Sequence, residues 1–375
     1  MRLAVGIALA LTLALTACGG GAPTASASRA ATASPVASPT AAAKHDPCSR
    51  AQGATSVTLP VTGFGRVVGD THHCQVFVSS PASNAVVAVD FSGDVLKTIP
   101  DEFGAGAMAI DGSTLYVALT TTGAIDAIDT ETLTRIKTVA TGLVKPRDLV
   151  FAGGRLWTTT GECAQWSLQL VGIDPATGKV SPFDAARSTN LSYCAGFATT
   201  ASNGNVLVAW DSGLEPGSLT VFNVSGATPV IQASKREETL GNLIDAAITP
   251  HGDKLVTASG SPYEFDQWAL ASASPDGVVY PGSAYPNSVA ISPVRSGLVV
   301  TGLSQHDGDS VAEYELGKPA PVATMLNVGT SHSLLYPRGL AFSGDGSLIF
   351  AVTGVSLDGT APSVTLNILP GPNLS

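Results

Sequence analysis

The feature that most constrains this chain is a group of four short apolar segments between Gly106 and Gly142. Each is five or six residues long, and turn-forming residues such as Asp-Gly separate it from the next. Segments of this kind predict the strands of an antiparallel meander. Because four strands alone cannot bury both faces of their sheet, we expect the unit to repeat. The four segments are Ala107–Asp111, Leu115–Leu119, Ala124–Asp129 and Arg135–Val139.

The unit does repeat, at a nearly even spacing. One apolar residue marks the first strand of each unit, and consecutive markers are 41, 41, 48, 49, 43 and 51 residues apart. Units of about 40–50 residues, each a four-stranded sheet, are typical of propeller blades. We therefore predict an all-β fold, a seven-bladed β-propeller of four-stranded antiparallel blades. The markers are Val67, Met108, Leu149, Phe197, Ala246, Val289 and Leu340.

The two ends of the repeat region predict how the ring closes. The last unit supplies only three strands, Gly339–Ser343, Leu348–Val355 and Ser363–Leu369. Upstream of the first unit, Ser56–Val61 is an apolar strand without a blade of its own. We expect this N-terminal strand to complete the last blade, which would leave only short, protected sheet edges.

Several segments resemble the repeats of YVTN and NHL propellers. The resemblance extends over about Thr55–Leu369 and implies the propeller fold, but such repeats serve many unrelated activities. It is carried by the blade-opening segments Pro286–Pro293 and Pro337–Gly346, by the strand pair Val76–Ser79 and Asn84–Asp90, and by D-x-x-T-G-like turns at Asp129 and Asp174.

The N-terminus predicts export and a lipid anchor. Arg2 precedes the apolar segment Leu3–Leu15, which is too short to span a bilayer and fits a signal peptide. The segment continues into Leu15-Thr16-Ala17-Cys18, which resembles the lipobox of bacterial lipoproteins. The resemblance implies that the Cys18 thiol is lipidated and that Cys18 becomes the mature N-terminus. An ordinary secretory signal with a chance cysteine is the alternative.

The predicted organisation has three parts. Residues 1–17 form a lipoprotein signal peptide, residues 18–46 a flexible tether rich in Ala, Ser, Thr and Pro, and residues 47–375 the propeller. We expect a monomer at the cell membrane, lipid-anchored on the extracytoplasmic face. The net charge of −10 and the lack of a Lys/Arg cluster disfavour nucleic acid and anionic lipid headgroups as partners. The lipid would be the only membrane contact.

Five cysteines, less Cys18, leave an even number for disulfides in an oxidising compartment. We letter the strands of a blade a to d from the axis outward. The d–a and b–c loops then lie on one face of the ring, and the a–b and c–d turns on the other. This topology pairs Cys163 with Cys194 on the first face and Cys48 with Cys74 on the second. Free or metal-bound thiols are the alternative, although no C-x-x-C motif exists.

We expect function on the face that carries the d–a and b–c loops, near the mouth of the axial channel. The b–c loops are expected to be short in the first two blades and longer in the third to sixth. Alternatively, the polar residues there bond to loop backbone, and the aromatic residues pack beneath the loops. The candidate binding residues are Arg147, Asp148, Trp166, Asn242, Asp245, Tyr263, Phe265, Trp268, Asn287 and Arg338.

Metal and catalytic chemistry receive weaker support. Lactonase-like propellers hold a divalent cation with axial Glu, Asn and Asp residues, and four candidates have suitable types. That family has six blades, however, and its motif is absent. A calcium loop at Gln305–Ser310 and a metal site at His72–His73 are further hypotheses. The simpler interpretation of Gln305–Ser310 is a solvated turn. The simpler interpretation of His72–His73 is that adjacent side chains on an extended strand point to opposite sides. We predict no resident cofactor, with a divalent cation at the channel mouth as the alternative. The four lactonase-like candidates are Asp148, Asn242, Asp245 and Asn287.

The sequence thus predicts a ligand- or protein-binding or scaffold module at the bacterial cell envelope, with an envelope protein or a small polar ligand as partner. The alternatives are a metal-assisted hydrolase or lyase at the channel mouth and a purely structural envelope protein. Neither the ligand nor the presence of catalysis follows from the sequence.

Overall fold

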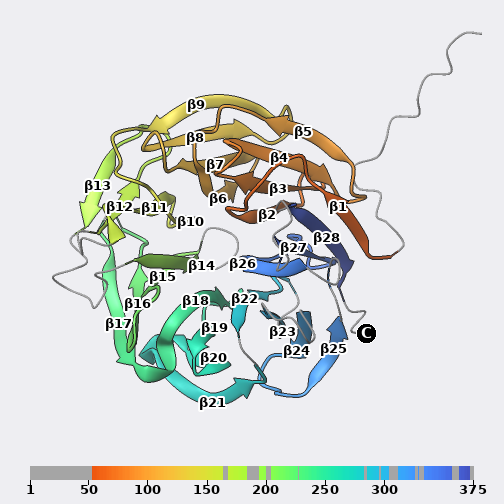
Figure 1. The fold of residues 1–375 in the computed structure, drawn as a ribbon. Coiled ribbons are helices and arrows are strands. Elements are labelled where there is room, and N and C mark those ends of the chain that lie inside the picture. The colour runs from red at the N-terminus through yellow and green to blue at the C-terminus, as the bar shows by residue number, and fades with distance from the viewer. Residues whose placement is uncertain are drawn as a thin grey trace, which may run out of the picture. The chain divides into compact units, whose positions relative to one another are not determined.

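A computed structural model describes residues 53–371, apart from 164–167, 184–193, 200–203, 227, 283–284, 295–296, 304–310, 326–327, 329–332 and 357–362. The compact unit that holds the blades spans His45–Ser375. Its strands form seven four-stranded antiparallel sheets arranged as a ring (Figure 1). The all-β, seven-bladed prediction is confirmed.

The first three blades follow the chain without interruption. Blade one comprises β2 (Val67–Asp70), β3 (Gln75–Ser80), β4 (Ala85–Asp90) and β5 (Val95–Ile99). Blade two comprises β6 (Ala105–Asp111), β7 (Thr114–Leu119), β8 (Ala124–Asp129) and β9 (Thr134–Ala140). Blade three comprises β10 (Leu149–Ala152), β11 (Arg155–Thr160), β12 (Gln169–Ile173) and β13 (Val180–Phe183).

The remaining blades continue the same order. Blade four comprises β14 (Ala195–Thr199), β15 (Val206–Asp211), β16 (Gly217–Asn223) and β17 (Val230–Glu237). Blade five comprises β18 (Gly241–Ile248), β19 (Lys254–Ser261), β20 (Tyr263–Ala269) and β21 (Ser274–Tyr280). Blade six comprises β22 (Pro286–Ile291), β23 (Leu298–Leu303), β24 (Val311–Glu315) and β25 (Pro321–Met325). The 3-10 turns η2 (Glu238–Leu240) and η3 (Leu270–Ser272) flank blade five's strands.

The last blade closes the ring with the N-terminal strand. Its own strands are β26 (Ser333–Phe342), β27 (Leu348–Ser356) and β28 (Thr365–Pro370), and β1 (Thr55–Thr58) pairs antiparallel with β28. The register places Thr55 opposite Ile368 and Thr58 opposite Thr365. In Figure 1, β1 accordingly lies beside the blue β28, at the outer edge of the last blade. The predicted closing strand is therefore present.

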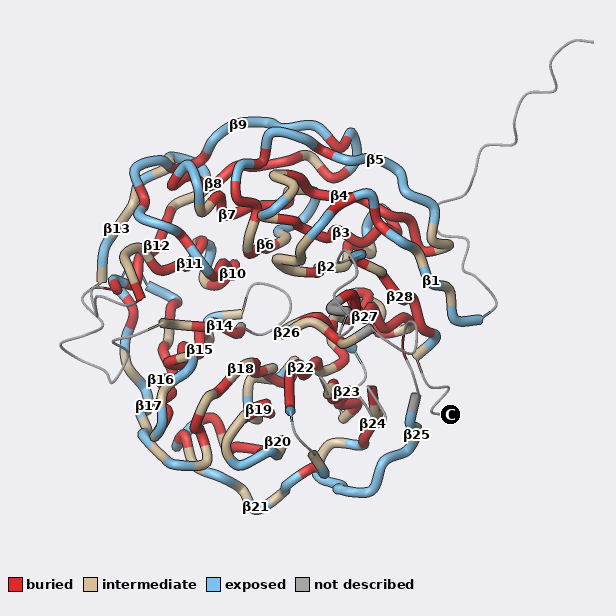
Figure 2. The backbone as a smooth tube through the Cα atoms, viewed as in Figure 1, coloured by how far each residue is buried: buried red, intermediate tan, exposed pale blue. Residues whose placement is uncertain are grey.

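Side-chain packing follows from the position of each strand in its blade. All residues of β3 and β4 are buried, whereas most of β5 and β9 is exposed at the rim of the ring (Figure 2). The apolar clusters lie between neighbouring blades; Val76 and Val87 of blade one belong to the same cluster as Phe350 of the last blade. Burial of these faces against the next blade explains why the meander has to repeat.

All seven sequence markers lie on inner strands, and each segment of the Gly106–Gly142 meander is a strand. One loop expectation is wrong. Blade five has no long b–c loop, because β19 ends at Ser261 and β20 begins at Tyr263. None of the helices in the described part of the chain has the length and apolar character to cross a membrane.

Candidate functional site

Four charged side chains meet at the axis, where the inner strands begin. Arg66 directly precedes β2, Asp148 directly precedes β10, Asp245 lies within β18, and Arg338 lies within β26. They come from blades one, three, five and seven. We call these four residues the axial cluster.

Asp148 accepts hydrogen bonds from three other blades of the ring, and its side chain is only 2% exposed. Its Oδ1 accepts hydrogen bonds from Arg66 Nη2 at 2.5 Å and from the Leu149 N–H at 2.9 Å. Its Oδ2 accepts from Arg338 Nη1 at 2.5 Å and from the Phe197 N–H at 2.6 Å. Burial alone would raise the pKa of Asp148, but the two arginine charges and these hydrogen bonds outweigh it and hold the pKa below its ordinary value.

Asp245 is held by three consecutive blades. Its Oδ1 accepts from the Ala246 N–H at 3.0 Å and from Arg338 Nε at 3.3 Å. Its Oδ2 accepts from the Val289 N–H at 3.0 Å and the Ser288 hydroxyl at 3.3 Å. Here burial outweighs the attraction of the two arginines, so the pKa of Asp245 is raised. All four carboxylate oxygens of the axial cluster therefore accept two hydrogen bonds each.

The two arginines differ in how fully they are bonded. Besides its two carboxylate partners, Arg338 donates from Nη2 to the Phe197 carbonyl at 3.0 Å, and its guanidinium carbon lies 5.3 Å from the ring centre of Trp210. Arg66 has one side-chain hydrogen bond, through Nη2; within the described residues its Nε and Nη1 have no partner. Each of the three side-chain nitrogens of Arg338 thus donates at least once, whereas two of the three in Arg66 have no described partner.

An axial cavity of about 370 Å³ adjoins the axial cluster, and inner strands of all seven blades line it. Arg66, Asp245 and Arg338 form its polar end. The lining then follows the inner strands into the a–b turns, where Pro250 and Pro293 are partly exposed. Its apolar wall includes Met108, Ile110, Phe151, Ile291 and Phe342.

The structure brings together three predicted site residues, Asp148, Asp245 and Arg338, and places Asn287 next to them. The Asn287 amide donates to the Leu335 carbonyl at 2.6 Å and so links blade six to blade seven. The residues predicted from the sequence did not include Arg66, although its position in the repeat indicated a place at the axis. It stands directly before the marker Val67, as Asp148 and Asp245 stand directly before their markers.

The other predicted residues lie away from the axial cluster. Arg147 is exposed on the loop before β10, and Asn242, the second residue of β18, has a left-handed backbone with φ of 51°. Tyr263 is exposed and contacts Tyr285 edge to face, with ring centres 5.1 Å apart. Trp166 lies outside the described residues.

Phe265 and Trp268 require a correction. We expected both on a binding loop, but they lie in β20 and are completely buried. Phe265 packs toward blade six, and Trp268 packs toward blade four. The Nε1 of Trp268 donates to the hydroxyl of Thr257, within blade five, at 3.1 Å. Alternation of neighbouring side chains along a strand sends the two rings into opposite inter-blade cores.

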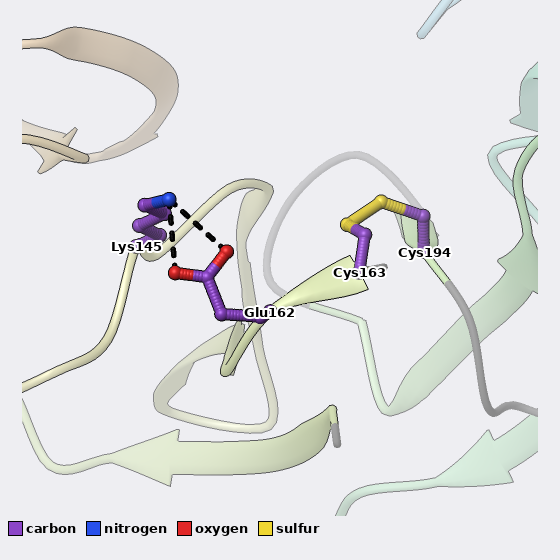
Figure 3. Close-up of a disulfide and its surroundings, with 4 residues drawn as sticks. All are labelled: Lys145, Glu162, Cys163 and Cys194. Atoms are coloured by element: carbon purple, nitrogen blue, oxygen red, sulfur yellow. Dashed lines mark hydrogen bonds and ion pairs between the residues drawn. A yellow bond between two sulfur atoms is a disulfide. The ribbon is translucent and has the colours of Figure 1, made fainter. Parts of the chain in front are cut away.

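A disulfide joins Cys163 to Cys194, the pairing that the topology predicts (Figure 3). Their Cα atoms are 4.9 Å apart, and the bond links the region after β11 to the start of blade four. Nearby, Glu162 forms an ion pair with Lys145 at 2.9 Å. The proposed partner of Cys74, Cys48, lies outside the described residues.

The metal hypotheses gain no supporting geometry. Among the residues with described positions, no three His, Cys, Asp or Glu side chains are grouped to hold a metal ion. His73 instead contacts Asp70 at 2.8 Å and Thr130 at 2.9 Å, and so links blades one and two. Gln305–Ser310, the hypothetical calcium loop, lies outside the described residues.

Seven blades around a lined axial cavity define this protein as a β-propeller with its candidate site on the axis. The chain belongs to the DUF6923 family, described as a repeat of unknown function, whose model matches residues 80–294. No curated protein matches the sequence. A solved structure of Kuenenia stuttgartiensis hydrazine synthase shares the fold, with a TM-score of 0.64 and 14% identity over 87% of this chain and 100% of that one. Since 1363 solved chains match, the fold alone does not select a function.

Proposed function

We propose that this protein is a lipid-anchored, extracytoplasmic propeller that binds a small molecule in its axial cavity at the bacterial cell envelope. The observation that carries the proposal is the cavity itself, which all seven inner strands line. Its volume of about 370 Å³ lies within the range of small-molecule sites, which are typically apolar with a few fixed polar groups.

The proposed location rests on the N-terminal sequence. The lipobox-like Leu15–Cys18 segment supplies the anchor, and the tether before the blades keeps the ring off the membrane surface. The Cys163–Cys194 disulfide supports an oxidising compartment. Binding in the cavity then presents the captured molecule outside the cytoplasm.

The contacts of the axial cluster favour binding over metal-assisted hydrolysis. A catalytic cation would need free carboxylate oxygens, but those of Asp148 and Asp245 accept from arginines, backbone N–H groups and a hydroxyl. Asn287 donates from its amide nitrogen to the Leu335 carbonyl, and the backbone N–H of Asn242 donates to the Leu214 carbonyl. Recruiting these residues to a cation would break the bonds that join the blades.

The experiment tests whether the cavity retains small molecules. The full chain carrying Cys18→Ser, which needs no detergent, is equilibrated with an extract of bacterial envelope and analysed by native mass spectrometry. Ala247→Phe adds a ring to a partly exposed lining position, and Thr134→Phe adds the same ring to the exposed rim. We expect bound species in the parent and in Thr134→Phe but not in Ala247→Phe. No retained species, or equal retention in Ala247→Phe, would overturn the proposal.

A further inference from the structure

We infer that the ligand of the axial cavity is a small monocarboxylate with an apolar body, and that its carboxylate binds the free donors of Arg66. The inference rests on the proposed function and adds the chemical class of the ligand.

The polar end of the cavity has more free donors than free acceptors. Asp245, the carboxylate that lines the cavity, already accepts four hydrogen bonds. Arg338 donates from Nε, Nη1 and Nη2 to acceptors of the protein. Arg66 donates only from Nη2 to Asp148, which leaves Nε and Nη1 without a partner in the described chain. The group that completes this end must therefore accept hydrogen bonds.

The unpartnered nitrogens of Arg66 also reach open space. Arg66 lines the cavity, and its side chain keeps 14% of its surface exposed. The unpartnered Nε and Nη1 of Arg66 are not fully enclosed by protein, whereas the unpartnered Nη1 of Arg155 is. Nε and an adjacent Nη group form a fork that matches the two oxygens of a carboxylate. An incoming carboxylate can thus bind Arg66 without displacing Asp148.

The electrostatic surroundings of Arg66 also favour an anion. Asp148, the only carboxylate that Arg66 contacts among the described residues, is shared with Arg338. Burial and the neighbouring Arg338 charge lower the pKa of Arg66, in agreement with its two unpartnered nitrogens. A monoanion beside Nε and Nη1 would supply a counter-charge in a poorly solvated position.

The wall of the cavity favours a ligand with an apolar body. Beyond Arg66, the strand β2 continues for three residues that line the cavity, Val67–Gly69, a rise of about 10 Å. The surrounding wall is apolar, with Met108, Ile110 and Phe342 among its residues. A bare inorganic anion would leave this wall in contact with water, whereas an acyl chain or a ring would bury it.

The experiment compares octanoate, octanamide, acetate and inorganic phosphate by calorimetry on the full chain carrying Cys18→Ser. We expect octanoate to bind at least about tenfold more tightly than the other three. Arg66→Gln should remove the preference for octanoate over octanamide, and Arg66→Lys should retain part of it. Arg236→Gln, which makes the same charge change on the exposed outer strand β17, should leave all affinities unchanged.

The outcomes separate the inference from the proposed function. Equal binding of octanoate and octanamide to the parent, which requires no variant, would overturn the carboxylate assignment. Persistence of the preference in a folded Arg66→Gln chain would overturn the role of Arg66. Equal binding of phosphate or acetate would overturn the role of the apolar wall. In each case a molecule retained from extract and lost in Ala247→Phe would still support a binding function.

Discussion

Nη1 of Arg338, in the last blade, lies 2.5 Å from Oδ2 of Asp148, in the third blade, and this ion pair joins residues 190 positions apart. Two separate sets of contacts thus hold the ring together. At the rim, β1 pairs with β28; at the axis, the axial cluster links blades one, three, five and seven. The axial tie also holds Arg338 at φ of 59°, a left-handed conformation that a non-glycine residue adopts only when its surroundings compensate.

Removal of the Arg338 side-chain charge should destabilise the whole ring. Arg338→Met leaves Asp148 and Asp245 buried with fewer compensating charges, so we expect a loss of about 3–5 kcal/mol in the free energy of unfolding. Denaturant titration followed by fluorescence measures it. Arg236→Met, on the exposed outer strand, should change stability by less than about 0.5 kcal/mol. Equal effects of the two substitutions would show that the axial tie contributes nothing.

Asp266 should make stability depend on pH. It is 5% exposed, its Oδ2 has no hydrogen-bond partner within the described residues, and burial together with the Glu264 charge raises its pKa to about 7. Because the folded state binds this proton more tightly than the unfolded chain, stability should fall as the pH rises from about 4 to 7, by at most about 1.4 kcal/mol per pH unit.

The variant Asp266→Asn keeps a neutral side chain at every pH and should flatten this decline. Unfolding titrations at pH 5 and pH 8 measure the difference, with Glu131→Gln as the matched exposed change. If Asp266→Asn showed the same decline as the parent, the titrating group would lie elsewhere.

The turn between β10 and β11 offers a paired test of glycine. A Cβ on Gly153 would lie 2.0 Å from the Val224 carbonyl oxygen, whereas one on Gly154 would meet nothing within 4 Å; both have positive φ. Gly154→Ala should therefore cost about 1 kcal/mol, and Gly153→Ala at least about 2 kcal/mol more. Thermal unfolding of the two variants measures the difference in stability. Equal losses of stability in the two variants would mean that Val224, in the fourth blade, moves away from the added Cβ without a measurable energetic penalty.

Lipidation should depend on Cys18 alone. We expect the native protein in the membrane fraction with a mass increased by a diacylglycerol group, and Cys18→Ser in the aqueous phase after detergent phase separation. A soluble native protein, cleaved before an unmodified Cys18, would indicate the ordinary secretory signal instead.

Much of the fold followed from local sequence, because strands and tight turns depend on residues that are neighbours in the chain. The marker spacing predicted the seven blades, and the unpaired Ser56–Val61 segment predicted the closing strand. The prediction failed at blade five, where the polar residues of Tyr263–Ala269 suggested a loop although the segment is a strand.

The sequence by itself determined one marker residue on each inner strand, and therefore which residues stand near the axis. Only the tertiary structure decided their partners. Arg66 reaches Asp148 across 82 residues and Arg338 reaches it across 190, so neither pair leaves a local signal. The same long-range geometry occupies every carboxylate oxygen of the axial cluster and leaves Nε and Nη1 of Arg66 without a partner among the described residues. Repetition sets the positions, whereas closure of the ring brings opposite charges from distant blades within hydrogen-bonding distance.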